Sequence, residues 1–106
     1  MPWLTLRGVI LLAECEAEIE AARARYPRFD EIWIGITWLL ARNPEPPGSF
    51  LSVERDGRKY FIYGFRGDAD ADIPDMWIFY EHNDQHVLVH GINANDAPRD
   101  TEADEA

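Results

Sequence analysis

Prolines divide the first half of the chain into two segments that can each form one helix. A proline inside a helix removes a backbone hydrogen bond and clashes with the preceding turn, so helices end at or before it. Pro27 therefore ends a helix that starts near Leu12, and the run 43–48 (NPEPPG) ends a second helix that spans about Asp30 to Arg42. Because the link around Pro27 is short, we expect a helical hairpin.

Apolar residues recur at steps of three and four in both segments, which is typical of helices with a buried face. Acidic residues gather in the first turns of the first helix and arginines near its end, as the helix dipole favours. The second helix is apolar well beyond one stripe, and such a helix is covered on most sides. We therefore expect it to contact the sheet and also the first helix or a partner chain. The first stripe is Leu12, Cys15, Ile19, Ala22 and Tyr26, and the second is Phe29, Ile32, Trp33, Ile36 and Leu40, with Ile34, Trp38 and Ala41 beside it.

The second half of the chain reads as strands. Asp56-Gly57 is a strong signal for a two-residue hairpin turn, and the polar segment from Arg66 to Asp75 reads as a loop. Helices that precede a run of antiparallel strands indicate an α+β fold with the order β-α-α-β-β-β-β. The predicted strands are Trp3–Leu11, Phe50–Glu54, Lys59–Phe65, Met76–Glu81 and His86–Ile92.

Charge and composition limit the class of protein. The chain has 106 residues, of which 46% are hydrophobic, and this fits one domain with a modest core over residues 1–92. Residues 93–106 hold five acidic residues, one arginine and no large apolar side chain, so we expect a disordered tail. A formal net charge of −10 argues against a protein whose main task is to grip nucleic-acid phosphates, although the segment Arg55–Arg66 is locally basic.

The cellular compartment follows from two absences in the sequence. The chain has a single cysteine, Cys15, and hence no internal disulfide, which is typical of a reducing compartment. No apolar run reaches the length of about 18 residues that a membrane span needs. We therefore expect a cytoplasmic protein that does not enter a membrane.

The sequence predicts neither a metal site nor a cofactor. His86 and His90 lie four residues apart on one strand and are thus separated by roughly 13 Å, too far for one zinc ion. The Asp68–Asp72 run resembles a calcium loop, but Ile73 and Phe79 stand where that loop needs Gly and Glu. The sequence also lacks the glycine-rich loops that bind phosphate or dinucleotides.

Three local motifs follow the helical hairpin in order. Residues 43–51 read NPEPPGSFL, residues 57–63 read GRKYFIY, and residues 77–92 read WIFYEHNDQHVLVHGI. Together they resemble the RelE/ParE superfamily, the toxins of bacterial type II toxin–antitoxin pairs, and the resemblance covers roughly Val9 to Ile92. It implies a helical hairpin packed on a mainly antiparallel, twisted sheet.

The resemblance also implies a function. A toxin of this type is held silent by a cognate antitoxin, whose extended or helical segment wraps it. ParE-like members poison DNA gyrase, whereas RelE-like members cut messenger RNA on the ribosome with basic and acid–base side chains of the sheet. Trp77 stands where the ribosome-dependent members usually carry an arginine, and those members tend to end in basic or aromatic residues rather than in an acidic tail.

These departures favour a toxin or toxin-like protein that acts mainly through protein–protein binding, with DNA gyrase or the ribosome as its target. One alternative is a ribosome-associated mRNA endoribonuclease of the same fold. Another is a catalytically silent RelE/ParE-like binding or regulatory module.

Candidate catalytic residues come from the basic hairpin and the closing strands. Basic side chains contact phosphates and stabilise charge during attack on RNA, and histidine serves as a general acid or base near neutral pH. Neighbouring Arg58 and Lys59 point to opposite faces of their strand, which weakens a single convergent patch. The alternative interpretation is a charged, exposed hairpin end with surface or packing histidines. The candidates are Arg55, Arg58, Lys59, Arg66, Tyr80 and His90.

The tryptophans are candidate partner-binding residues. Trp33 and Trp38 lie five residues apart on the second helix and cannot share one face of it. Both could pack in the core, or one could face an antitoxin or a second copy of the chain, since interfaces are enriched in Trp. We therefore predict Trp33, Trp38 and Trp77 as partner-binding candidates, with a homodimer among the possible assemblies.

Overall fold

The computed structural model describes residues 6–98, which form two α-helices, five strands and one short 3-10 helix. The predicted α+β class, with a helical hairpin ahead of the antiparallel strands, is confirmed. The elements are β1 (Gly8–Leu11), α1 (Ala13–Arg25), α2 (Phe29–Arg42), β2 (Ser49–Arg55), β3 (Arg58–Phe65), η1 (Ala69–Ala71), β4 (Asp75–His82) and β5 (His86–Asn95).

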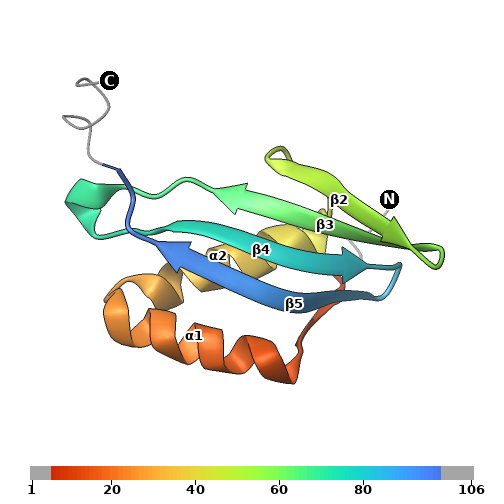
Figure 1. The fold of residues 1–106 in the computed structure, drawn as a ribbon, viewed down its shortest axis with the longest axis horizontal. Coiled ribbons are helices and arrows are strands. Elements are labelled where there is room, and N and C mark those ends of the chain that lie inside the picture. Colours follow the sequence, from red (N-terminus) through yellow and green to blue (C-terminus); the bar gives the residue numbers. More distant parts are fainter. Residues whose placement is uncertain (1–5, 99–106) are drawn as a thin grey trace.

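The five strands form one sheet in the order β1-β5-β4-β3-β2. β1 runs parallel to β5, and the remaining pairs are antiparallel. The helical hairpin carries the chain from β1 at one edge of the sheet to β2 at the other. Figure 1 shows both helices on one side of the sheet, so the sheet has a covered face and an open face.

The core lies between the helices and the covered face of the sheet. Alternate residues of each strand point to opposite faces, and the apolar members of the covered face are fully or nearly fully buried. The predicted helical stripes supply the other side of this core. The buried cluster is Cys15, Ile19, Ala22, Tyr26, Phe29, Trp33, Ile36, Leu40, Phe61, Met76, Ile78, Tyr80, Val87, Val89 and Ile92.

The hairpin between β2 and β3 turns on the two residues that the sequence predicts. Asp56 and Gly57 have φ angles of 53° and 78°. Positive φ at both central residues defines the turn type whose twist matches that of paired strands. The register shifts once between Leu51 and Val53 of β2 and once between Phe79 and Tyr80 of β4, where the ladder is irregular.

The sheet extends further along the sequence than predicted. β5 continues to Asn95, because Asn93, Ala94 and Asn95 pair with the first residues of β4. The predicted tail boundary at residue 93 is therefore wrong, since polar side chains at the end of a strand are tolerated where the backbone is paired. Residues 99–106 of the predicted disordered tail lie outside the described residues.

Neither helix of the described part of the chain is long and apolar enough to cross a membrane. α1 and α2 have 13 and 14 residues and serve to cover the sheet.

Candidate functional site

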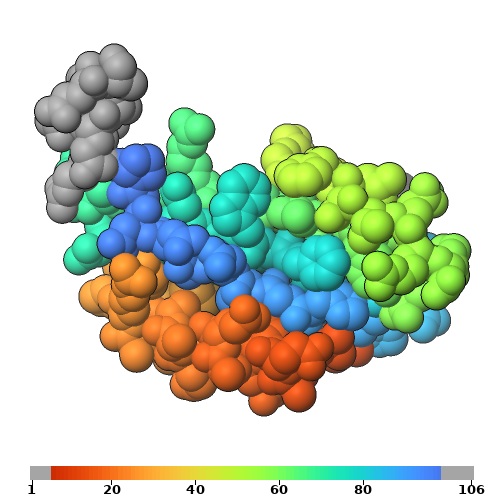
Figure 2. All heavy atoms as spheres, in the orientation of Figure 1, coloured from red at the N-terminus to blue at the C-terminus, as the bar shows by residue number. Residues whose placement is uncertain are grey.

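The open face of the sheet carries a group of polar and aromatic side chains that contact one another. Figure 2 shows atoms of β3, β4 and β5 across the front of the molecule, with α1 along the lower edge and no helix above the strands. The residues that face this side alternate with the core residues of each strand. They are Arg58, Tyr60, Ile62 and Gly64 of β3, Trp77, Phe79 and Glu81 of β4, and His90 of β5.

Glu81 lies at the centre of a polar network on this face. Its two carboxylate oxygens accept hydrogen bonds from Arg58, with Nε 3.1 Å from Oε1 and Nη2 2.5 Å from Oε2. Nε2 of His90 lies 2.7 Å from the same Oε2. The Glu81 side chain is 11% exposed, against 22% for His90 and 56% for Arg58. A nearly buried carboxylate is thus held between a forked guanidinium and an imidazole.

Aromatic rings fix the imidazole of His90 in place. The rings of Tyr60 and Phe79 stack with their centroids 5.6 Å apart. The His90 ring meets Tyr60 edge-on at 5.4 Å and tilts toward Phe79 at 5.8 Å. The Arg58 guanidinium lies 5.7 Å from the centroid of the Tyr60 ring, within the range of a cation–π contact. His90 and Arg58 therefore each contact an aromatic ring as well as the carboxylate of Glu81.

The network keeps its carboxylate ionised. Burial opposes the charge on Glu81, but hydrogen bonds from Arg58 and His90 outweigh it and hold the pKa of Glu81 below its ordinary value. The same pairing raises the pKa of Arg58. Because an ionised carboxylate only accepts hydrogen bonds, Nε2 of His90 carries the proton of their contact. The group therefore places a carboxylate that can accept a proton beside an imidazole and a fixed positive charge.

A groove of about 320 Å³ opens on the same face, at the opposite end of β3. Gly48 and Gly64 both line it, and the backbone N–H of Gly64 donates to the carbonyl oxygen of Gly48 at 3.0 Å. Phe50 and Trp77 are 51% and 50% exposed, so each presents half of its side chain to solvent. The complete lining is Gly48, Phe50, Gly64, Phe65, Arg66, Asp75 and Trp77.

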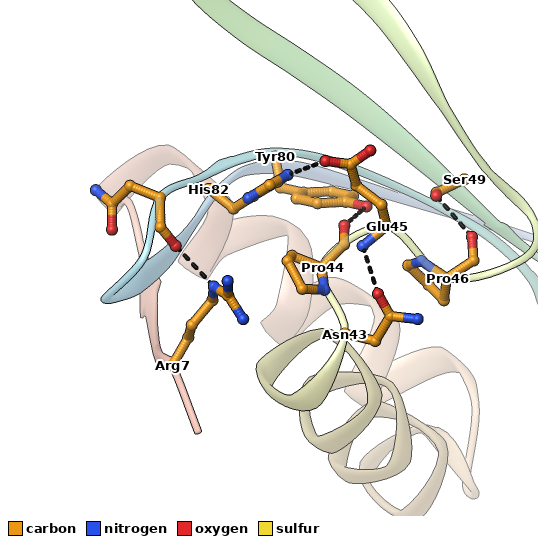
Figure 3. Close-up of polar contacts among 9 residues, drawn as sticks. Arg7, Asn43, Pro44, Glu45, Pro46, Ser49, Tyr80 and His82 are labelled. Atoms are coloured by element: carbon orange, nitrogen blue, oxygen red, sulfur yellow. Dashed lines mark hydrogen bonds and ion pairs between the residues drawn. The ribbon is translucent and has the colours of Figure 1, made fainter. Parts of the chain in front are cut away.

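Tyr80 faces away from these groups, into the core, and anchors the link between α2 and β2. Its hydroxyl donates to the carbonyl oxygen of Pro44 at 2.5 Å, as Figure 3 shows. Burial raises the pKa of Tyr80 to about 12. Beside it, Nε2 of His82 lies 3.0 Å from Oε2 of Glu45, a residue of the same link. These two contacts with the end of β4 hold the link between α2 and β2 in place.

The structure brings two of the six candidate catalytic residues together. Arg58 and His90 meet at Glu81. Arg55 pairs with Arg58 across the hairpin and so shares its face of the sheet, whereas Lys59 points to the opposite face. Arg66 lies at the groove, at the other end of β3, and Tyr80 is completely buried. The six residues do not form one site.

The three candidate tryptophans lie in three different environments. Trp33 is 8% exposed and stacks on Phe29, with ring centroids 6.1 Å apart in the core. Trp38 is 54% exposed on the outer side of α2, where no other element of residues 6–98 covers it. Trp77 lies on the open face of the sheet. Trp38 and Trp77 therefore belong to separate surfaces, one on each layer of the molecule.

Sequence reasoning missed Glu81, the residue that joins the network. Strand alternation places Glu81 on the same face as Trp77 and Phe79, and this signal was present in the sequence. The cross-strand partners were harder to find, because the register shift after Phe79 leaves His90 without a direct partner on β4. Among the described residues, no three His, Cys, Asp or Glu side chains are arranged to hold a metal ion.

A scan against protein-family models found no match, and searches of curated proteins and of solved structures found none either.

Proposed function

We propose that this chain is a toxin or toxin-like protein of the RelE/ParE type, which binds a protein target and is neutralised by a cognate antitoxin. A toxin that meets both an antitoxin and a target needs room for two protein contacts. The observation that carries the proposal is the presence of two separate exposed apolar surfaces, one on α2 and one along β2. The motif order described above supplies the RelE/ParE part of the proposal.

The first surface, the α2 patch, consists of Ile34 and Trp38. They lie one turn apart on the same side of α2 and are 57% and 54% exposed. The buried stripe of the helix faces the core instead. Large aromatic and aliphatic side chains that are left uncovered on a helix are typical anchors for a protein partner.

The second surface, the β2 edge, consists of Phe50, Leu51 and Val53. Within residues 6–98, β2 pairs only with β3, so its other side presents backbone groups that no other described strand pairs. The three side chains are 51%, 47% and 40% exposed and point to both faces of the sheet. An extended segment of a partner can add a strand to such an edge and pack its side chains against these residues.

Induction of the protein alone in bacteria tests the proposal. We expect growth to stop, and we expect co-expression of the small gene next to it to restore growth. Replication and translation, followed separately, distinguish gyrase from the ribosome as the target. Trp38→Ala and Val53→Arg then assign the surfaces, because each should remove either growth arrest or rescue while the protein stays folded. Normal growth at high soluble expression would overturn the toxin function.

A ribonuclease is the second candidate function, and the contact among Arg58, Glu81 and His90 favours it. In RNA cleavage a base takes the proton of the ribose 2′-hydroxyl, whose oxygen attacks phosphorus, and an acid gives a proton to the departing 5′-oxygen. Glu81 fits the role of base, and His90 fits that of acid in its doubly protonated, imidazolium form. Arg58 would stabilise the negative charge that develops on the phosphate oxygens.

The two candidates differ in what His90→Gln does to induced cells. If the network cuts RNA, messenger RNA is cleaved on induction, and His90→Gln abolishes the cleavage together with the growth arrest. His86→Gln is the matched control, because His86 lies on the same strand but outside the network. Messenger RNA that stays intact while growth stops excludes the ribonuclease and leaves the protein-binding toxin.

A further inference from the structure

The groove between Phe50 and Trp77 has the chemistry of a site for a planar, negatively charged ligand. Two half-exposed aromatic side chains line an opening of about 320 Å³, together with Gly48 and Gly64. Gly64 lets the Trp77 indole itself lie against the sheet, because a Cβ there would come within 2.6 Å of the ring, and half of the Trp77 side chain stays exposed for stacking. Aromatic side chains of this kind stack on nucleobases without regard to sequence.

One basic and one acidic side chain, Arg66 and Asp75, also line the groove and would orient a ligand in it. Arg66 lines it and, within residues 6–98, forms no ion pair at 4.0 Å or less. Its guanidinium is therefore available to a phosphate, which it matches in geometry. Asp75 also lines the groove, and its Oδ1 accepts a hydrogen bond from the backbone N–H of Gly67 at 2.7 Å, which fixes the carboxylate in place.

The net charge of the chain does not contradict an anionic ligand here, because a group of its acidic residues lies on the other side of the sheet. Helix α1, on the covered side of the sheet, carries four of them: Glu14, Glu16, Glu18 and Glu20. The open face carries Arg55, Arg58 and Arg66 against two carboxylates, Glu81 and Asp75. Glu81 is already neutralised by Arg58. Arginines thus outnumber carboxylates on this face.

From this arrangement we infer that the groove binds a nucleoside monophosphate unit. The base stacks against Trp77 and Phe50, the phosphate pairs with Arg66, and the carboxylate of Asp75 accepts a hydrogen bond from an amino or imino group of the base. The unit is either a free nucleotide or one nucleotide of a single strand, since both present the same base and phosphate. This site goes beyond the proposed toxin function and does not depend on it.

NMR titration of the purified, ¹⁵N-labelled full chain tests the site. The probes are AMP, GMP, CMP and UMP, with adenosine and inorganic phosphate as partial ligands and a uridine hexanucleotide as the single strand. We expect a saturable shift of the Trp77 indole N–H and the Gly64 amide. Arg66→Gln should weaken nucleotide binding about fivefold or more and leave adenosine unaffected, while Trp77→Leu should weaken both by about tenfold or more. Trp38→Ala, on the other layer, is the matched control.

The arms of this experiment separate the outcomes. Tighter binding of the hexanucleotide than of UMP identifies a single strand as the source, and equal binding identifies the free nucleotide. No saturable shift of Trp77 below about 10 mM nucleotide, which corresponds to negligible affinity, overturns the site. Inorganic phosphate that binds as tightly as AMP also overturns it, because the aromatic side chains would then contribute nothing. If Trp77→Leu fails to fold, the exposed Arg66→Gln variant decides the question.

Discussion

The indole of Trp77 lies so close to the backbone of Gly64 that no side chain fits between them. A Cβ atom built on Gly64 would lie 2.6 Å from Cζ3 of Trp77 and 3.2 Å from Cε3 and Cη2. The two residues are cross-strand partners in the β3–β4 ladder. Glycine weakens a strand interior, and here the aromatic ring of the neighbouring strand covers the gap.

Gly64→Ala should therefore displace the Trp77 indole into solvent. Forcing an extra methyl group against a packed ring costs about 1–3 kcal/mol, and the lower backbone entropy of alanine returns about 0.5–1 kcal/mol. We expect a net loss of about 1 kcal/mol in urea unfolding and a red shift of tryptophan emission. Unchanged emission would show that Trp77 does not depend on Gly64.

Gly35→Ala is the matched control for this variant. Gly35 lies inside α2, and a Cβ there meets no heavy atom within 4 Å. Alanine in an open helical position stabilises by about 0.5–1 kcal/mol relative to glycine. The two substitutions are chemically identical, so opposite signs in the free energy of unfolding isolate the contact with Trp77.

Trp33 and Trp38 should respond very differently to truncation. Trp33→Ala removes a buried ring from the core and should cost about 3–5 kcal/mol in the free energy of unfolding. Trp38→Ala removes a ring that is 54% exposed and should change it by about 0.5 kcal/mol or less. Chemical denaturation of both variants measures the difference. Equal costs would mean that Trp38 is covered by a partner, such as a second copy of the chain.

The sequence predicts the layout of this fold well, because its strongest signals are local. Pro27 and the segment after Arg42 limit the helices, and α1 and α2 end within two residues of the expected positions. The turn at Asp56-Gly57 forms as predicted. Such signals act between near neighbours in the chain, where no knowledge of pairing is needed.

The candidate site was harder to predict, because it depends on contacts between distant residues. Arg58, Glu81 and His90 come from three strands, and only the register of the sheet brings them together. Tyr80 and Glu81 are adjacent in the sequence but belong to opposite faces, so the choice of Tyr80 as a site residue followed from its type rather than its direction. β5 likewise extends to Asn95 because pairing with β4 satisfies a polar backbone segment.

Tyr80 should make the protein sensitive to alkali. Its pKa is raised from 10.0 to about 12, so the folded state retains the proton longer than the unfolded state does. The resulting stability is complete below pH 10 and is lost as the pH rises toward 12. Cys15, with its pKa raised from 9.0 to about 11, acts in the same direction.

Tyr80→Phe should remove the Tyr80 part of this alkaline loss and leave the parts from Cys15 and from Tyr26, whose pKa is also raised. At neutral pH it costs about 1 kcal/mol, because the carbonyl oxygen of Pro44 loses its hydrogen bond. Denaturation curves at a series of alkaline pH values test both effects. Tyr60→Phe, on the open face of the sheet, is the control for loss of a phenol outside the core. A wild-type slope in Tyr80→Phe would assign the loss to other groups.

Glu81 should contribute stability that disappears in acid. Hydrogen bonds from Arg58 and His90 lower the pKa of Glu81 from the ordinary 4.5, so the folded state releases this proton more readily than the unfolded state. The stabilisation is therefore complete above about pH 4.5 and is lost as the pH falls through the lower folded value. The measurement is the free energy of unfolding as a function of pH.

Glu81→Gln tests this contribution, because glutamine keeps the shape but cannot ionise. At neutral pH the variant should lose about 1–3 kcal/mol, since Arg58 and His90 then face a neutral amide. The gap between wild type and variant should narrow as the pH falls below 4.5 and through the lower folded pKa, because the wild-type carboxylate becomes protonated. Glu54→Gln, at an exposed position of β2, should differ from wild type by about 0.5 kcal/mol or less throughout. A gap of constant size from neutral pH to acid would mean that Glu81 stabilises the fold through its packing and not through its charge.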